Sequence, residues 1–383
     1  MSCHVYLVPG FFGFSSLGSL SYFRGVGRAL RGSLSRRGID AEVIECSTRP
    51  TGFVKYRARD LLEQVLATGG AEADELHFVG HSTGGLDVRQ LLTPSVQVEK
   101  AALAERIGRL TRSATLVSTP HRGTPLAQFF CDIRGRETLR VLASEASTRG
   151  RLAIVGAARL LDAIASLDDA ARGNSRARRL LWRRVLRRIP FDEGDPVWSF
   201  LRQIEADQGS MLLLTTEWMD HFNAAVEDRA TVRYGSVVTG APSPLGRGLW
   251  GLLRQGPLGL GLGYAILYAL VAWTPSAPSR TPLPPGLLAD LRRGLSLPVH
   301  AQTNDGVVPT LSQLYGTLIA TAEADHADIV GQFRRWGSGG RGDWLPSGAD
   351  FDEGDFSRVW DAVAAFIVES GPREHGVRAH AEG

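Results

Sequence analysis

The first 120 residues alternate short apolar runs with longer amphipathic segments. Four runs have the length and composition of buried β-strands: residues 5–8, 41–44, 76–79 and 114–117. Three segments between them carry apolar residues at helical spacing: residues 22–36, 57–68 and 86–92. Strands that alternate with helices predict a mostly parallel sheet with helices on both faces, an α/β fold.

The alternation stops after this region and resumes twice. Residues 128–230 show helical periodicity with little strand signal, and a strand is predicted again at 231–238. Residues 241–297 are rich in Gly, Pro and Leu and interrupt the pattern a second time. The apolar segment 297–302 predicts the last long strand, and apolar residues at helical spacing over 359–367 predict a closing helix.

These interruptions suggest one core with two insertions. We expect the core to comprise 1–127, 231–240 and 298–371, the helical lid or cap 128–230, the apolar second insertion 241–297, and a mobile polar tail 372–383.

Composition narrows the class of protein. The chain has 383 residues, is 43% hydrophobic and carries a net charge of only +3, so we expect no nucleic-acid partner. Three cysteines, Cys3, Cys46 and Cys131, form no disulfide framework and suit a reducing compartment. The first residues lead into a strand without the basic and apolar regions of a signal peptide. The sequence predicts a cytoplasmic location, with export by a signal-independent route as the alternative.

Ser82 is the candidate nucleophile. Residues 80–84 read G-H-S-T-G and match G-x-S-x-G, between a predicted buried strand and a predicted helix. The strand-turn-helix setting is what a nucleophile elbow requires, because the turn strains the serine backbone and leaves no room for Cβ atoms at the glycines. The alternative is an ordinary glycine-rich turn with a capping serine.

An oxyanion hole needs two preorganised N–H donors. One comes from the residue after the nucleophile, here Thr83, and the other from the loop after an early strand. Residues 9–13 (PGFFG) form such a loop, and the Phe11 N–H is the candidate donor.

The chain has nine histidines, from which a catalytic base must be chosen. His81 adjoins the serine and should point away from its hydroxyl, and His121 is better explained by structural packing. His4 and His77 lie on or beside predicted strands and are also better explained as structural, and His375 and His380 belong to the polar tail. Of the remaining candidates, His221, His300 and His326, only His326 lies in a polar loop before the final helix, as the chain order nucleophile, acid, histidine requires.

Asp305 is the candidate acid. It directly follows the predicted strand 297–302, and the carboxyl ends of parallel strands are where sites form in open α/β sheets. Its carboxylate would orient His326 and stabilise the imidazolium ion. Asn-Asp-Gly is also strong turn chemistry, and Asp325 and Asp290 are weaker alternatives for the acid.

Together these segments resemble bacterial triacylglycerol lipases of the Pseudomonas and Burkholderia type, within the α/β-hydrolase superfamily. The similar blocks are 5–13 (VYLVPGFFG, with Pro9 where those lipases usually have histidine), 76–85 (LHFVGHSTGG), 118–126, 232–236, 304–309 (NDGVVP) and 326–333 (HADIVGQF). They cover about half of the chain and leave the two insertions unmatched. The resemblance implies an α/β-hydrolase fold and a Ser82–Asp305–His326 triad.

The resemblance also implies a structural Ca²⁺ ion held by the segment after the histidine. Asp328 and Gln332 would be ligands there, and oxygen ligands suit Ca²⁺. The alternative is that Asp328 only caps the following helix.

Two segments of the insertions suit contact with an anionic membrane. Residues 176–189 group Leu, Trp, Val and Ile on one face of an arginine-rich helix, and the alternative is a solvated arginine face packed against the acidic residues 192–195. Residues 257–273 are uncharged and strongly apolar but too short and too broken by Gly and Pro to span a bilayer, so we expect a buried cap or an interfacial segment, with a shallow membrane anchor as the alternative.

The sequence thus predicts a lipase-type serine carboxylester hydrolase that needs no cofactor for its chemistry. Triacylglycerol is the substrate that the resemblance implies, with a phospholipid or acyl transfer to an alcohol as alternatives. A non-catalytic lipid- or protein-binding module is the alternative from another class.

Overall fold

The computed structural model describes residues 2–10, 16–17, 20–49, 52–94, 100–131, 212–244, 260–283, 285–333, 343 and 345–371. Phe11, most of the predicted lid and the tail 372–383 lie outside the described residues. So does the arginine-rich segment 176–189, while the apolar segment 257–273 is described from Leu260 onward.

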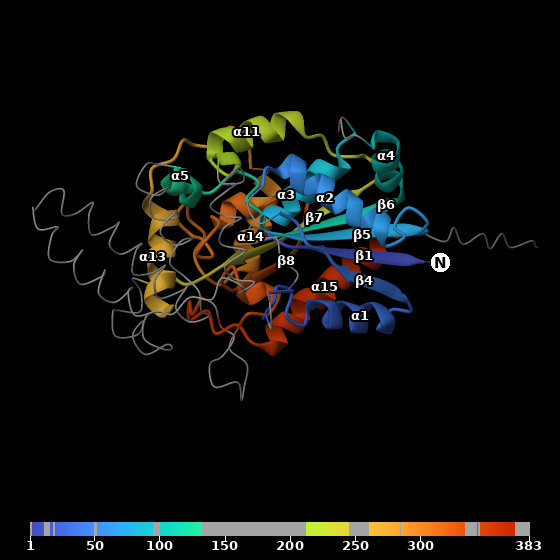
Figure 1. The fold of residues 1–383 in the computed structure, drawn as a ribbon. Helices are drawn as coiled ribbons and strands as arrows, with labels where there is room; N and C mark the ends of the chain where they lie inside the picture. The colour runs from blue at the N-terminus through green and yellow to red at the C-terminus, as the bar shows by residue number, and fades with distance from the viewer. Residues whose placement is uncertain are drawn as a thin grey trace, which may run out of the picture.

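A six-stranded parallel sheet forms the centre of the molecule (Figure 1). Its strands, in spatial order, are β4 (Ala41–Glu45), β1 (Cys3–Val8), β5 (Glu75–His81), β6 (Thr111–Val117), β7 (Arg233–Gly240) and β8 (Thr317–Glu323). Every neighbouring pair is parallel. A separate two-stranded antiparallel pair joins β2 (Ser16–Leu17) to β3 (Leu20–Ser21).

Helices cover both faces of the sheet, as the alternating pattern predicts (Figure 1). One face packs against α1 (Val26–Arg36) and α15 (Glu353–Ser370). The other face packs against α2 (Val54–Ala67), α3 (Thr83–Leu92) and α4 (Ala101–Leu110).

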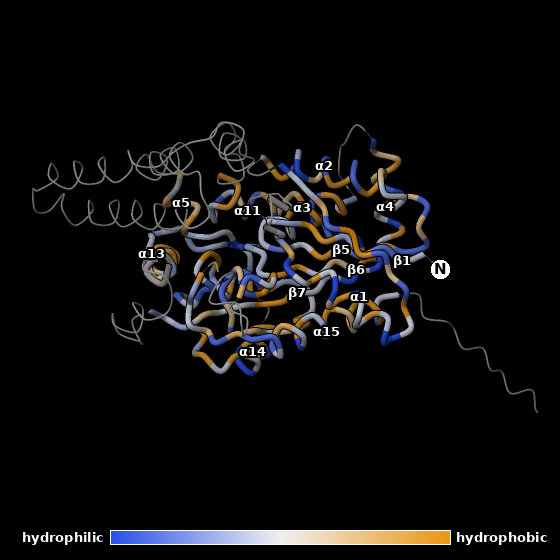
Figure 2. The backbone as a smooth tube through the Cα atoms, turned by 60° about the horizontal axis from the view of Figure 1, so that its bottom comes forward, coloured by the Kyte–Doolittle hydropathy of each residue, from blue (hydrophilic) through white to orange (hydrophobic). Residues whose placement is uncertain are grey.

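Alternation along the strands divides the core between these two faces. In β1, Val5 and Leu7 face α1 and α15, whereas Tyr6 and Val8 face α2 and its neighbours. All residues of β1 are buried, which explains why it appears in the sequence as a continuous apolar run. Figure 2 shows this apolar character along the central strands β5 and β6.

The predicted strand at 297–302 is wrong. Pro298 lacks an N–H that could donate to a neighbouring strand. Its carbonyl accepts a hydrogen bond from the Thr303 hydroxyl, and that hydroxyl oxygen accepts one from the His300 backbone N–H, so the segment forms a turn. The last strand is β8, whose alternating Thr and Ala residues give a weaker apolar signal. Asp305 therefore lies in the connection between β7 and β8.

The described part of the second insertion contains two helices. The apolar helix expected there is α13 (Leu260–Trp273), which contacts α5 (Pro125–Cys131) at the end of the molecule where the strands finish (Figure 1). The other is α14 (Pro285–Gly294), which packs against β8. Among the described residues, no helix combines the length and apolarity needed to cross a membrane.

Polar contacts join the described ends of the two predicted insertions to each other, and one of them to the core. Asp220, on α11 (Thr216–Ala225), accepts hydrogen bonds from the hydroxyls of Ser279 and Thr281. Arg122, in the loop after β6, donates to the carbonyls of Thr281 and Leu314. These contacts hold α11 and the segment between α13 and α14 beside the carboxyl ends of the strands.

Candidate active site

Ser82 occupies a sharp turn between β5 and α3. Its backbone has φ 55° and ψ −130°, a conformation that costs a non-glycine residue about 1–3 kcal/mol. A Cβ atom on Gly84 would lie 2.3 Å from the Val8 carbonyl oxygen, and one on Gly80 would lie 2.6 Å from the Gly84 backbone. The close backbone approach explains both motif glycines, and the predicted strand-turn-helix geometry is confirmed.

The loop after β1 lies directly against this turn. A Cβ atom on Gly10 would come 2.6 Å from the Cβ of Ser82. Thr83 is the first residue of α3, and the N–H groups of a first helical turn have no partner within the helix. The structure therefore brings Thr83 and the described start of the predicted oxyanion loop to the nucleophile, while Phe11 lies outside the described residues.

A fully buried ion pair supports that loop from behind. Arg57 on α2 donates from Nε to both carboxylate oxygens of Asp87, at 3.0 and 2.9 Å. Its Nη2 donates to the carbonyls of Pro9 and Gly10, at 3.0 Å each. Burial raises the pKa of Asp87 to about 6, and the Arg57 charge opposes that rise. The guanidinium thus fixes the Pro9–Gly10 backbone beside Ser82.

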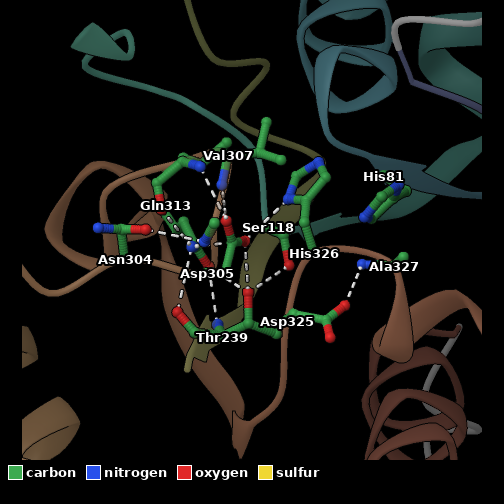
Figure 3. Close-up of polar contacts among 12 residues, drawn as sticks. His81, Ser118, Thr239, Asn304, Asp305, Val307, Gln313, Asp325, His326 and Ala327 are labelled. Carbon is green, nitrogen blue, oxygen red and sulfur yellow. Dashed lines mark hydrogen bonds and ion pairs between the residues drawn. The ribbon is translucent and has the colours of Figure 1, made fainter. Parts of the chain in front are cut away.

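A second buried network lies beneath the candidate base. The Gly10 N–H donates to the Tyr22 hydroxyl oxygen at 2.9 Å, and that oxygen lies 2.7 Å from His81 Nδ1. Burial and the neighbouring His326 hold the pKa of His81 well below its usual value, so the ring is neutral. The His81 side chain is thus engaged with Tyr22. Its ring centroid lies 4.6 Å from that of His326, which it supports (Figure 3).

Asp305 and His326 lie in contact, as the predicted triad requires. Asp305 Oδ2 lies 2.8 Å from His326 Nδ1, and the His326 N–H donates to the Asp305 carbonyl (Figure 3). The carboxylate is fully buried and accepts further bonds from the N–H groups of Val307 and Val308, the Thr239 hydroxyl and the Gln313 amide. These donors fix the orientation of the carboxylate and compensate its buried charge.

The other candidates from the sequence lie in different surroundings. His121 is buried and stacked on Tyr315, with ring centroids 4.4 Å apart, as a packing role requires. His221 and His300 are exposed, and Asp290 is paired with a surface arginine.

Three carboxylates gather next to the histidine loop: those of Asp325, Asp328 and Asp343, with oxygens within 4.8 Å of one another. Asp325 Oδ1 accepts from two backbone N–H groups, but its buried Oδ2 has no hydrogen-bond partner. Burial raises the pKa of Asp325 to about 6, and burial together with the Asp325 charge raises the pKa of Asp328 well above its usual value. A group of carboxylate oxygens in buried surroundings fits a hard divalent cation.

The Gln332 side chain binds the backbone at the end of β3. Its amide nitrogen donates to the carbonyls of Ser21 and Tyr22, at 2.7 and 3.1 Å. These bonds tie the histidine loop to the end of β3. Its role as a metal ligand stays a prediction.

Sequence reasoning missed the residues that support the site. Arg57 and Asp87 appeared only as polar positions of two amphipathic helices, and Gln313 belongs to a short 3₁₀ helix, η2 (Thr310–Gln313). The spacing of these three residues along the chain gives no signal that they lie near the site. Asp325 was identified, but as an alternative acid and not as part of a carboxylate group.

Comparisons with known proteins agree with this geometry. No protein-family model matches the chain. A triacylglycerol lipase of Vibrio cholerae is 29% identical over 171 residues, which are 43% of this chain and 48% of that lipase. The chain therefore matches only about half the length of this curated relative.

Solved structures match over most of the chain. EstA of Clostridium botulinum superposes with a TM-score of 0.54 and 17% identity, covering 96% of this chain and 87% of EstA. Lipase 1 of Pelosinus fermentans gives a TM-score of 0.54 and 16% identity, covering 96% of this chain and 98% of that lipase. The Staphylococcus hyicus lipase gives a TM-score of 0.50 and 15% identity, covering 96% of each chain. With its parallel sheet, flanking helices and serine turn, the chain has the α/β-hydrolase fold, which these structures share.

Proposed function

We propose that this protein is a serine carboxylester hydrolase that cleaves lipid acyl esters, with Ser82, His326 and Asp305 as its catalytic triad. The proposal rests on a strained serine turn whose neighbour, His81, lies against a histidine oriented by a buried carboxylate. A relative named as a triacylglycerol lipase, 29% identical over 171 residues, supports the reaction class.

The proposed reaction proceeds through an acyl-enzyme. Ser82 Oγ attacks the ester carbonyl carbon while His326 Nε2 takes the hydroxyl proton, and the N–H groups of Thr83 and Phe11 stabilise the oxyanion. The intermediate then collapses, and His326 returns the proton to the departing alcohol. Water, deprotonated by the same imidazole, attacks the acyl-enzyme and releases the fatty acid and the free serine. Asp305 keeps the histidine proton on Nδ1, so that Nε2 is free to accept.

Exposed tryptophans favour an aggregated lipid substrate. Trp218 on α11 is 43% exposed and Trp273 at the end of α13 is 57% exposed. Large aromatic side chains with a polar N–H suit the interface between water and lipid. The two residues come from the two insertions, which follow the carboxyl ends of strands that form the site. We propose triacylglycerol as the substrate, and the experiment below distinguishes it from phospholipid.

A structural Ca²⁺ ion is proposed at the histidine loop. Asp325, Asp328 and Asp343 would hold it, and its charge would compensate carboxylates that burial otherwise disfavours. It would keep the loop that carries His326 in place and supply no chemistry to the reaction.

The experiment compares wild type with Ser82→Ala on p-nitrophenyl esters of short and long chain, then on emulsified triacylglycerol and phospholipid vesicles. Loss of the nucleophile should lower kcat about a millionfold. Faster turnover of long-chain and emulsified substrates would favour a lipase over a general esterase. Two folded proteins equally inactive on every substrate would contradict the proposal and favour a binding module.

A further inference from the structure

Three side chains of different chemistry meet at the end of the sheet opposite to Ser82. Cys3 and Glu75 begin neighbouring parallel strands and are register partners, and His77 pairs with Val5 two positions further on. Because side chains alternate along a strand, all three point to the face covered by α1 and α15. Ser82 follows Glu75 by seven residues, about 23 Å along the strand, so the cluster is separate from the active site.

The cluster contains buried polar atoms without partners. The Cys3 sulfur, a Glu75 oxygen and a His77 nitrogen all lie within 4.8 Å of one another. His77 Nε2 is 3.9 Å from Glu75 Oε1, beyond hydrogen-bond distance. His77 Nε2 and Glu75 Oε2 are both buried, and neither has a hydrogen-bond partner. Buried polar atoms normally have one, and this group leaves two atoms unsatisfied at one point.

The spacing and the donor set suit a zinc ion. Zinc bonds of about 2.0–2.3 Å at tetrahedral angles separate two ligand atoms by about 3.3–3.8 Å, close to the observed 3.9 Å. The opposite nitrogen of the ring, His77 Nδ1, lies 2.7 Å from the Ser113 hydroxyl. A metal-binding histidine usually has such an outer hydrogen bond, which orients its free nitrogen toward the metal. Thiolate and imidazole ligands favour zinc over calcium or magnesium.

The charges also balance. A thiolate and a carboxylate carry two negative charges, which a divalent cation neutralises in a buried site. A Cβ atom on Gly371 would lie 3.3 Å from Glu75 Oε2, so the carboxyl end of α15, where the helix dipole is negative, adjoins the cluster. The neighbouring His77 is the largest cause that holds the pKa of Glu75 below its usual value, and Arg112 adds a smaller positive contribution. Burial raises the pKa of the Cys3 thiol to about 12, and bound zinc would displace its proton.

We propose that Cys3, Glu75 and His77 form a structural zinc site that links the starts of β1 and β5, with water as the fourth ligand. The ion would fasten two central strands at the end where the chain enters the sheet. It would stabilise the fold without taking part in ester hydrolysis.

The test uses the full chain, purified without a polyhistidine tag, stripped with a chelator and reloaded with zinc. We expect one zinc ion per chain by elemental mass spectrometry. Cys3→Ser and His77→Gln should each weaken zinc binding roughly 100-fold or more. Added zinc should raise the Tm of wild type by roughly 5 °C but leave that of the variants unchanged. Co²⁺ should give a thiolate-to-metal charge-transfer band in wild type.

Two control variants make the result specific. Cys46→Ala removes another buried thiol, on the opposite face of the sheet, and should keep both the zinc and the cobalt band. Replacing His375 and His380 by alanine removes the histidines of the C-terminal segment and should also keep them. If zinc is lost with that pair, or if wild type binds zinc no more tightly than Cys3→Ser, the proposal is wrong. If Cys3→Ser does not fold, the cobalt spectrum of wild type decides, because the absence of a thiolate band excludes Cys3 as a ligand.

Discussion

Replacing Asp305 with asparagine tests the proposed acid with the smallest change in shape. The side-chain oxygen would keep the bonds from the N–H groups of Val307 and Val308, at 3.0 and 2.8 Å. An NH₂ group would then occupy the position of Oδ2, facing the amide of Gln313 at 3.1 Å and His326 Nδ1 at 2.8 Å. Both are donors, so the amide of Gln313 would lose one of its three acceptors but keep the carbonyls of Thr239 and Val308, at a cost of about 0.5–1.5 kcal/mol in the free energy of unfolding.

The larger effect falls on catalysis. His326 would have to place its proton on Nε2, which could then no longer accept the proton of Ser82. The loss of the correct tautomer costs about 10⁴-fold in kcat in a triad of this kind. We expect that loss in p-nitrophenyl ester hydrolysis, with Asp290→Asn, a change at an exposed surface pair, as a control that keeps full activity. A folded Asp305→Asn variant within tenfold of wild type would refute the assigned role.

Three further predictions rest on the supporting residues and surfaces. Arg57→Lys keeps the positive charge but cannot bind Asp87 and the loop carbonyls together, so the free energy of unfolding should fall by about 3–5 kcal/mol in chemical denaturation. In ester hydrolysis kcat should decline with KM nearly unchanged, and an unaltered kcat would show that this ion pair does not support the oxyanion loop. Asp325 has a pKa of about 6 in the folded protein against an ordinary 3.8, so in EDTA the free energy of unfolding should fall by about 3 kcal/mol as the pH rises from 4 through 6. Added Ca²⁺ should restore this free energy at pH 8, and equal thermal unfolding curves with and without Ca²⁺ would argue against the ion. Trp218→Ala together with Trp273→Ala should lower vesicle binding and emulsion hydrolysis severalfold but leave soluble short-chain esters unaffected, and a parallel loss on both substrates would contradict an interfacial role.

The regular part of the fold could be predicted from the sequence because its strands are buried on both faces. Continuous apolar runs indicated β1, β5 and β6. Two glycines indicated the turn at Ser82, because the neighbouring backbone leaves no room for a Cβ atom at either position. Asp305 and His326 were found through chain order and loop chemistry, and the structure brings their side chains together.

Other features depend on contacts between distant segments. The strand expected at 297–302 was wrong because its apolar residues pack beneath α14 from an irregular segment, where Leu295 and Val299 join one cluster. Burial lowers the pKa of His81 and raises that of Asp325. The depth of burial depends on contacts between distant segments, so it could not be predicted from the spacing of residues along the chain.

The most direct test of the account is the site of covalent labelling by a fluorophosphonate, mapped by mass spectrometry on the intact folded chain. Fluorophosphonates react with a serine activated by a neighbouring base, so the account predicts one adduct, on Ser82, that disappears in Ser82→Ala and forms far more slowly in Asp305→Asn. An adduct on another serine, or undiminished labelling of folded Ser82→Ala, would contradict the assignment of the nucleophile.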